Sequence, residues 1–435
     1  MTPAPRVRAL SIHADYRCRD TGACCSSGWD IPVEPEAEEG IRKALLAGTL
    51  RLFERGERRA PGPSIEHAFR PVSGLPHGAR AILARDVGGR CVFLETAGDR
   101  SRCAVHRRLG EGALPSVCRQ FPRVVALTPL GVSVTLSHYC PTAADLLFAV
   151  TPRSSVPPGP EGPAGPPAPA GSSPRQDPLL QVVGDPPAFP PSWPWEGLDA
   201  RDALPPLLRP DVLMTWTSLD RWERFAVDVL ADEDRTPEAA LDVLAAAAEE
   251  ARQWTRARGE FEGYFGRVLE GASSRGAERE GPAFQGALRN GSRYSRDPAR
   301  RGSREWTLLA DCVPDRALLP PAPEGLEAAD SRWVAPAWPA LGRPIRFWLA
   351  TKAFASWLVL HGEGLRTAVL GLRLALGVLR AEAARGCAEA GRALDAELLK
   401  EAVRRADLLL VHLADPEALA RRLGRRERGE GPRSG

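Results

Sequence analysis

The sequence predicts an α+β protein that is mainly α-helical, in which an irregular, cysteine-rich N-terminal metal domain with a β-hairpin precedes a helical C-terminal domain. Seven of the nine cysteines lie within the first 140 of 435 residues. A stretch rich in Pro, Gly, Ala and Ser follows, and beyond it helical patterns recur with no strong strand pattern between them. Helices in such a series pack against one another, so the two parts of the chain differ in class.

Composition divides the chain into a few segments, and its length allows two or three domains. Residues 151–180 cannot bury enough apolar area to offset the entropy of ordering, and we expect a disordered linker there. We expect the same of a basic insertion at 273–304, where eight Arg face three acids. The predicted order is a cysteine-cluster metal domain at 1–150, the linker, a helical domain at 181–422 with that insertion, and a disordered tail at 423–435.

Two regular elements are predicted within the cysteine-rich region. Residues 35–55 are typical of one helix, because Pro35 opens the segment and acids follow in its first turn. Residues 123–140, RVVALTPLGVSVTLSHYC, predict a hairpin, since apolar residues alternate with Ser and Thr and TPLG suits a type I turn. The arms begin just after Cys118 and end just before Cys140, so we expect these two thiols at the same end of the hairpin.

The helical domain shows start signals and a buried stripe. Thr217 and Ser218 are the predicted caps of one helix, and Pro237 opens an Ala-rich helix. Cys312 and Cys387 stand alone in the sequence and are expected to be small buried hydrophobes. Near the C-terminus, apolar residues at helical spacing predict a core face, made by Leu399, Val403, Ala406, Leu410 and Leu413.

Charge and hydropathy argue against several classes of protein. A net charge of +3 gives no general case for nucleic-acid or membrane binding, and the basic insertion contains no recognisable binding module. The N-terminal residues lack the continuous apolar core of a signal peptide. The longest apolar stretch, residues 367–380, is interrupted by Arg373 and is too short to span a bilayer. We therefore expect a cytoplasmic protein with neither membrane nor nucleic acid as a partner.

Clustered cysteines in the cytoplasm indicate metal or redox chemistry, because thiols stay reduced there. Thiolate is a soft ligand that binds zinc, copper(I) and iron–sulfur clusters, and structural zinc and cubane clusters each take four ligands. Seven cysteines therefore allow one centre with spare thiols, or two centres. Neighbouring side chains diverge, so Cys24 and Cys25 are not expected to ligate one small ion together.

No other motif of the sequence competes with the cysteines. Their spacings fit no zinc-finger pattern, and they lack the tight three-cysteine loop by which radical enzymes hold a cluster that cleaves S-adenosylmethionine. Rossmann-type, P-loop and Ser/His/Asp hydrolase patterns are missing as well. The residues by themselves thus indicate a metal-thiolate protein.

The segment YRCRDTGACC, residues 16–25, resembles the opening of the CxxCxxCC, or YkgJ-type, cysteine-cluster family of zinc- or iron-chelating domains. GGRCVFL at 88–94 and CAVHRRLGEGALPSVCRQFPR at 103–123 resemble the downstream half of that family. The family pattern has a cysteine where this chain has Thr21, whose hydroxyl is a poor ligand for a soft metal. The resemblance implies seven candidate metal ligands: Cys18, Cys24, Cys25, Cys91, Cys103, Cys118 and Cys140.

This chain resembles one branch of that family, the flagellin lysine-N-methylases, more closely than the family as a whole. The similar pieces are CCSSGWDIPV at 24–33, LGEGALPSVCRQFPR at 109–123 and VTLSHYCPTAADLLF at 134–148. This resemblance implies a protein lysine N-methyltransferase with S-adenosylmethionine as methyl donor, an iron–sulfur cluster as cofactor, and a protein substrate with a target lysine.

Methyl transfer to lysine needs a base, or a desolvated channel that lowers the pKa of the amine, because the amine must lose its proton before it attacks a methyl sulfonium. His106, His138 and Asp30 lie near candidate ligands and are the candidates for that base. His138 is also placed for a hydrogen bond to the thiolate of Cys140, two residues on. Arg119 is the candidate for donating a hydrogen bond to a thiolate or to the carboxylate of the donor.

A non-enzymatic function stays open beside the enzyme. A metal-thiolate domain can stabilise a helical protein, store iron or serve as a binding module, because metal binding supplies folding free energy. The substituted Thr21 and the lack of a readable donor site favour this alternative. Zinc is then the alternative to the iron–sulfur cluster.

Overall fold

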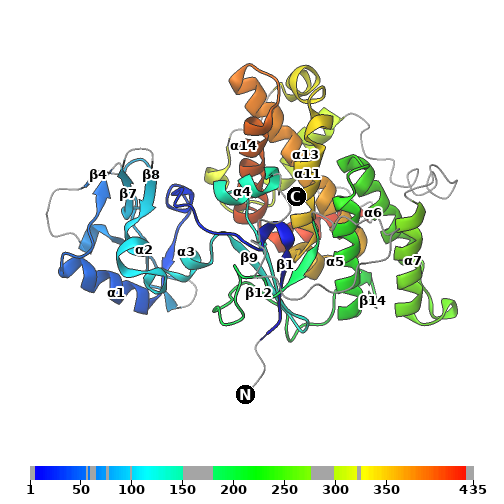
Figure 1. Ribbon diagram of the computed structural model, residues 1–435, viewed down its shortest axis with the longest axis horizontal. Coiled ribbons are helices and arrows are strands. Elements are labelled where there is room, and N and C mark those ends of the chain that lie inside the picture. Colours follow the sequence, from blue (N-terminus) through cyan, green and yellow to red (C-terminus); the bar gives the residue numbers. More distant parts are fainter. Residues whose placement is uncertain are drawn as a thin grey trace, which may run out of the picture.

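The computed structural model describes residues 5–54, 57–58, 65–74, 78–97, 100–149, 180–275, 298–320 and 325–427, which form two lobes of unequal size (Figure 1). The larger lobe combines a five-stranded sheet with most of the helices. The smaller lobe contains short helices and strands from the first part of the chain. The predicted class, α+β and mainly helical, is confirmed.

A sheet of order β11-β1-β10-β9-β12 lies in the larger lobe. Strands β9 (Arg123–Thr128) and β10 (Gly131–Leu136) form the predicted hairpin, with Leu136 opposite Arg123. Strand β1 (Val7–Leu10) runs parallel to β10. The sheet is completed by β11 (Val182–Gly184) and β12 (Leu198–Asp199). At the open end of the hairpin the Ser137 N–H donates to the Pro122 carbonyl over 2.7 Å. Cys118, which precedes β9, and Cys140, which follows β10, therefore lie at the same end of the hairpin, as expected.

This sheet corrects the predicted domain boundary at residue 150. Strands from both sides of residues 151–179 share it, so β1, the hairpin and helix α4 (Pro141–Phe148) belong to the larger lobe. The pairing of β1 with β10 joins residues more than 120 positions apart, such as Val7 and Val132. No local pattern predicts such a pairing, because register depends on which distant strand supplies the partner groups.

The smaller lobe holds the rest of the cysteine-rich region around its own core. That core contains Ile41, Phe69, Phe93 and Val105, all buried. Its helices are α1 (Pro35–Leu46), α2 (Ala104–Leu109) and α3 (Ser116–Gln120). Its strands form a β2-β6-β5 sheet and two ribbons, with β2 at Pro32–Val33, β3 at Phe53–Glu54, β4 at Glu57–Arg58, β5 at Phe69–Pro71, β6 at Ala81–Leu83, β7 at Leu94–Ala97 and β8 at Arg100–Cys103.

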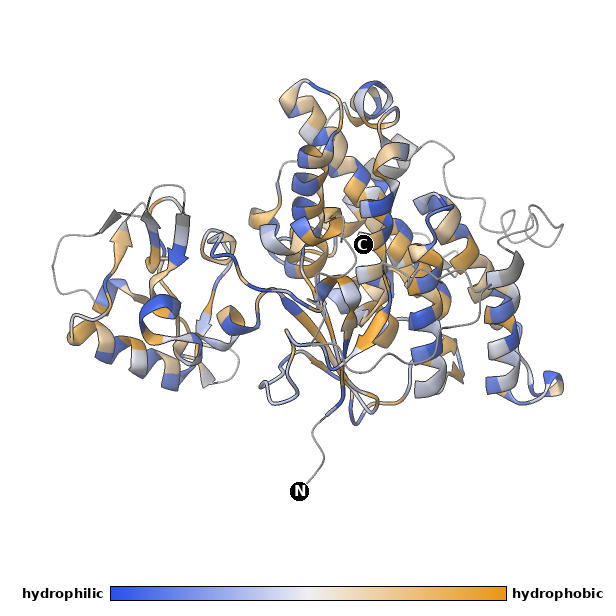
Figure 2. Ribbon diagram, in the orientation of Figure 1, coloured by the Kyte–Doolittle hydropathy of each residue, from blue (hydrophilic) through white to orange (hydrophobic). Residues whose placement is uncertain are grey.

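Helix α13 (Leu365–Ala390) runs through the larger lobe and packs against α6, α9 and α14. The helices carry hydrophobic and hydrophilic residues side by side along their length (Figure 2), as expected of elements packed on one face. The remaining elements are α5 (Trp216–Ala231), α6 (Pro237–Ala251), α7 (Phe261–Arg275), α9 (Pro298–Ala310), α10 (Leu326–Ala329), α11 (Gly342–Ala353), α12 (Trp357–His361), α14 (Ala396–Asp407), α15 (Pro416–Glu427) and the ribbon of β13 (Leu207–Arg209) with β14 (Val212–Leu213).

Several expectations for the helical region are confirmed. Pro237 is the first residue of α6, and Cys312 and Cys387 are buried. Four residues of the predicted stripe are buried and the fifth, Leu410, is partly buried. The predicted caps Thr217 and Ser218 are wrong, because Thr215 caps α5 by accepting a hydrogen bond from the Ser218 N–H over 3.0 Å. None of the described helices is long and apolar enough to cross a membrane.

The bounds of four predicted segments are corrected by the structure. The helix predicted for 35–55 ends at Leu46, because Gly48 turns the chain at a φ of +70°. The insertion predicted for 273–304 is shorter, since α7 reaches Arg275 and α9 begins at Pro298. Helix α15 extends through 423–427, and Leu180, expected in the linker, is fully buried. Residues 151–179, 276–297 and 428–435 lie outside the described residues, so the disorder predicted for them stays a prediction.

Close packing between α9 and α13 predicts a large effect at Gly377. A Cβ at this position would overlap the carboxylate of buried Glu305. We expect Gly377→Ala to lower the free energy of unfolding by about 3 kcal/mol, measured by denaturant titration. Gly386→Ala on the same helix is the control, because its Cβ would meet nothing closer than Leu398 at 3.9 Å. That control should be stabilised by about 0.5–1 kcal/mol; equal effects in the two variants would contradict the packing.

Candidate metal centre

Five of the seven candidate ligands meet in the smaller lobe, from four places in the chain. This thiol cluster consists of Cys24, Cys25, Cys91, Cys103 and Cys118. Cys24 and Cys25 lie in a short 3₁₀ turn, Cys91 just before β7, Cys103 at the end of β8, and Cys118 in α3.

Local backbone geometry brings these segments together. Gly22 has a φ of +69°, and a Cβ there would lie 2.7 Å from the Ser101 Cβ. Glycine therefore lets the turn that carries Cys24 and Cys25 lie against β8, which ends in Cys103. The Cys91 N–H donates to the Cys25 carbonyl over 2.7 Å, which ties the third segment to the same turn.

The sulfur atoms of the thiol cluster interact directly. Cys24 Sγ and Cys25 Sγ lie 4.0 Å apart. The expectation that these adjacent side chains diverge is therefore wrong, since the 3₁₀ turn directs both toward the same region. The thiols of Cys91 and Cys103 lie near enough to Cys25 to contribute to the rise of its pKa.

Proton sharing shifts the acidities of these thiols. A hydrogen bond from Cys25 lowers the pKa of Cys103 to about 7, and another lowers the pKa of Cys24. The same hydrogen bonds, to Cys103, Cys24 and Cys91, raise the pKa of Cys25. Burial raises the pKa of Cys118, and the neighbouring thiols add to the rise. A cation placed among these sulfurs would replace the shared protons, which is how thiolate metal sites form.

The fit of a metal to the thiol cluster is partial. Zinc bound to four sulfurs at about 2.3 Å in a tetrahedron places the sulfurs about 3.8 Å apart, close to the 4.0 Å between Cys24 and Cys25. Across the part of the chain that the structure describes, however, no group of three or more His, Cys, Asp or Glu is arranged to hold a metal ion. The fold thus brings suitable donors together without closing a coordination sphere around one point.

Cys18 and Cys140 lie beside the thiol cluster and not within it. Cys140 is buried, and its Sγ is 3.6 Å from the hydroxyl of Tyr16. Cys18 is exposed and accepts a hydrogen bond from the Asp20 N–H over 3.4 Å. Although the residue as a whole is exposed, partial desolvation of its thiol raises the pKa of Cys18, with a contribution from nearby Cys24. Thr21, which stands where the family pattern has a cysteine, is an exposed residue between these groups.

The predicted base and donor residues have different surroundings. His106 is half-buried on α2, and its backbone N–H helps to lower the pKa of Cys103. Asp30 lies at the surface and pairs with two arginines. Arg119 Nη2 is 3.7 Å from Glu196 Oε1, while its buried Nε has no partner within the described residues.

His138 does not have the predicted hydrogen bond to Cys140. Its Nδ1 lies 3.2 Å from Asp407 Oδ2, and its Nε2 lies 3.4 Å from His13 Nε2. Both ring nitrogens are engaged and the residue is fully buried. His138 is therefore also wrong as a base for a substrate amine, which could not reach it.

Buried Asp407 is the centre of a polar network that the sequence reasoning missed. Its carboxylate accepts from Lys352 Nζ at 2.7 Å, from Trp348 Nε1 at 2.9 Å and from the His138 N–H at 2.5 Å. Burial by itself would raise the pKa of Asp407, but Lys352 and His138 lower it overall. The network joins the hairpin to α11 and α14. The sequence signal that could have predicted a buried carboxylate is the acid Asp407 beside the apolar run of RRADLLLVHL.

The two histidines of this network have definite tautomers. With Asp407 ionised, His138 carries its hydrogen on Nδ1 and accepts on Nε2. His13 then donates from its Nε2, which leaves its Nδ1 without a hydrogen. That Nδ1 is buried, and no hydrogen-bond partner for it exists in the described part of the chain. Burial lowers the pKa of both histidines, so both are neutral near pH 7.

Four rings pack where the two lobes meet, next to the candidate ligands. Trp29 stacks on His412 with centroids 4.5 Å apart and an interplanar angle of 30°. Phe121 and Tyr139 complete the group. The ring centroids of Trp29, Phe121 and Tyr139 lie 5.3 to 6.4 Å from one another. Because these residues follow or precede Cys25, Cys118 and Cys140 closely in the sequence, their packing holds the thiol-bearing segments against the larger lobe.

His412 makes the stability of this contact depend on pH. Burial lowers the pKa of His412 from 6.5 to about 4, and its Nε2 lies 2.7 Å from Ser137 Oγ. The folded pKa lies below the unfolded one, so its stabilisation is complete above pH 6.5 and is lost as the pH falls toward about 4. Over this pH range we expect the free energy of unfolding of His412→Gln to fall by about 3 kcal/mol less than that of wild type, measured by urea unfolding. The exposed His67, changed to Gln, should behave like wild type.

Comparisons with known proteins add nothing to this geometry: no family model, no curated protein and no solved structure matches the chain.

Proposed function

We propose that the smaller lobe binds a metal centre through cysteine thiolates. The observation that supports this most is the thiol cluster, in which five cysteines from four places in the chain share hydrogen bonds and charge effects. All five are free thiols, which suits a cytoplasmic protein, where such thiols stay reduced. Five free thiols gathered in one small lobe are typical of a thiolate metal site.

An iron–sulfur cluster is the centre that we favour, with zinc as the alternative. Four cysteines ligate a cubane cluster, and the thiol cluster supplies that number with one to spare. When bound, an iron–sulfur cluster supplies transfer of single electrons. Cys18, whose pKa is affected by nearby Cys24 and Cys140, and Cys140 itself are the further candidate ligands. Zinc binds the same thiolates, so the iron, sulfide and zinc content of the chain distinguishes the two centres.

We further propose that a chain holding an iron–sulfur cluster acts as a protein lysine N-methyltransferase with S-adenosylmethionine as donor. The support for this step is the resemblance of residues 16–149 to the flagellin lysine-N-methylase branch. Of the candidate bases, His106 and Asp30 remain, since His138 is enclosed. Arg119 remains a candidate for the donor carboxylate. A zinc-bound chain without methyl transfer would instead be a non-enzymatic chelating protein.

The test of the metal centre is its elemental content. The full chain, purified without oxygen, should contain about four iron and four acid-labile sulfide per chain when a cubane cluster is present. One or two zinc without sulfide would replace the iron–sulfur cluster by a structural zinc site and remove the support for the methyltransferase. A chain that binds neither iron nor zinc after reconstitution would overturn the proposal.

A further inference from the structure

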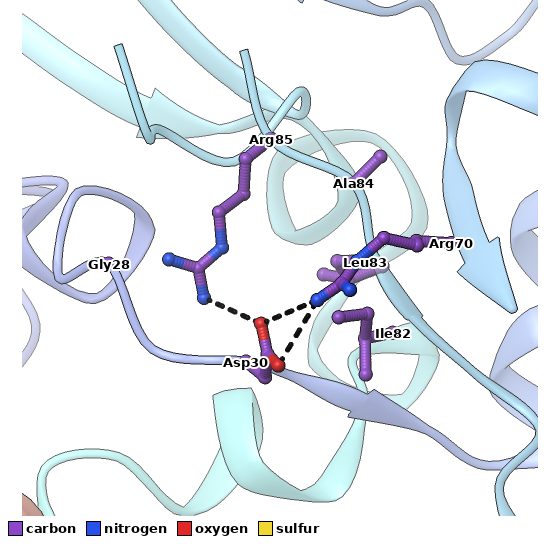
Figure 3. Close-up of a pocket in the computed structure, with 7 residues that line it drawn as sticks. All are labelled: Gly28, Asp30, Arg70, Ile82, Leu83, Ala84 and Arg85. Carbon is purple, nitrogen blue, oxygen red and sulfur yellow. Dashed lines mark hydrogen bonds and ion pairs between the residues drawn. The ribbon is translucent and has the colours of Figure 1, made fainter. Parts of the chain in front are cut away.

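A groove of about 410 Å³ opens on the surface of the smaller lobe, next to the thiol cluster. It is lined by Gly28, Asp30, Arg70, Ile82, Leu83, Ala84 and Arg85 (Figure 3). Its volume lies at the lower end of the range of small-molecule sites, about 300–1,000 Å³. The groove is close to the cluster, because its lining residue Arg85 pairs with Cys91 in an isolated β-bridge.

Two guanidinium groups converge on one carboxylate in this groove. Arg70 Nη2 lies 3.2 Å from both oxygens of Asp30, and Arg85 Nη2 lies 3.5 Å from Asp30 Oδ1 (Figure 3). These contacts use one nitrogen of each arginine. Within the described residues the other donors of both guanidinium groups make no hydrogen bond, and both arginines line the groove.

The position of Arg85 sets this triad apart from ordinary surface pairs. The Arg85 side chain is 21% exposed, against 62% for Arg70, and burial lowers its pKa. The buried residues Ile82 and Leu83 of β6 lie beside Arg70 in the same groove (Figure 3). A guanidinium that is already partly desolvated gains more from a carboxylate ligand than one in bulk water, because the attraction is stronger in a lower dielectric.

The charge pattern of the groove matches a zwitterion. Two arginines present a surplus of positive charge that suits a carboxylate, and Asp30, at 57% exposed, presents a negative charge that suits an ammonium. An α-amino-acid group carries these two charges one carbon apart. A simple anion would use the arginines only and would be repelled by Asp30.

We propose that this groove binds the α-amino-acid group of a small molecule, with the carboxylate on Arg70 and Arg85 and the ammonium on Asp30. Two sources supply this group: a free amino acid, and the methionine part of S-adenosylmethionine or of its product. The proposal stands on the groove itself and does not depend on a metal in the thiol cluster.

Calorimetric titration of the full chain tests the proposal with four probes. They are S-adenosylhomocysteine, methylthioadenosine, which lacks the amino-acid group, L-methionine, and L-methionine methyl ester, which lacks the negative charge. We expect the two probes with an intact amino-acid group to bind. The ester and methylthioadenosine should bind at least about tenfold more weakly than their parent compounds, because the ester loses the charge of the carboxylate and methylthioadenosine loses both the carboxylate and the ammonium. Similar affinities for S-adenosylhomocysteine and L-methionine would indicate a free amino acid; tighter binding of S-adenosylhomocysteine would indicate the methyl donor.

Variants assign the binding to the groove. Arg70→Gln, Arg85→Gln and Asp30→Asn should each weaken binding of the intact probes by about tenfold. Arg107→Gln is the matched control, since Arg107 pairs with Glu95 on the same lobe but outside the groove, and it should bind as wild type does. Arg70 is the most exposed of the three, so its variant keeps the test valid should Arg85→Gln fail to fold. Absence of binding by both intact probes, or groove variants that bind like Arg107→Gln, would overturn the proposal.

Discussion

Asp407→Leu should lower the free energy of unfolding by about 4 kcal/mol, because it removes the carboxylate that compensates a buried ammonium. Lys352 is 14% exposed and lies 2.7 Å from the Asp407 carboxylate, which is fully buried. The Trp348 indole and the His138 N–H lose their acceptor in the same variant. Denaturant titration of the purified variant measures the loss.

A second substitution separates charge from packing in this network. Asp407→Leu combined with Lys352→Met removes both charges, so the double variant should be more stable than Asp407→Leu. Glu397→Ala is the control on the same helix, since Glu397 pairs with Lys400 at the surface. This variant should change the free energy of unfolding by less than about 0.5 kcal/mol. A loss below about 1 kcal/mol in Asp407→Leu would contradict the buried network.

Cys103→Ala and Cys25→Ala should each remove most of the bound metal from the full chain, since they remove central members of the thiol cluster. A thiolate centre with one ligand deleted loses both coordination energy and the folding free energy that depends on it. Iron, sulfide and zinc per chain are measured after anaerobic purification. Because the thiol cluster has five members and a centre takes four ligands, the metal content of Cys91→Ala and Cys118→Ala should show which four are essential.

Two buried cysteines of the larger lobe provide the matched control. Cys312→Ala and Cys387→Ala change the same atoms in a helical core, where both thiols are buried and distant from the smaller lobe. Metal content should be unchanged in both variants. Equal loss of metal in all four variants would contradict a centre built on the thiol cluster.

The candidate ligands could be found from the sequence because cysteine chemistry is local and rare. Their density in the first 140 residues indicated a metal-thiolate protein. The spacing said nothing about which thiols meet. That Cys24 and Cys25 point to one place, while Cys140 contacts Tyr16, depends on a 3₁₀ turn and on the path of the hairpin.

The sequence by itself determined the mainly helical class, the hairpin at 123–140, the start of α6 at Pro237 and the burial of Cys312 and Cys387. Each follows from a period, a turn or a cap within about twenty residues, where neighbours along the chain decide the conformation. Only the tertiary structure decided the lobe boundary, the network around Asp407 and the groove at Asp30. These depend on partners that are distant in the sequence, such as Lys352 for Asp407 and Arg85 for Asp30, and local patterns carry no information about such pairs.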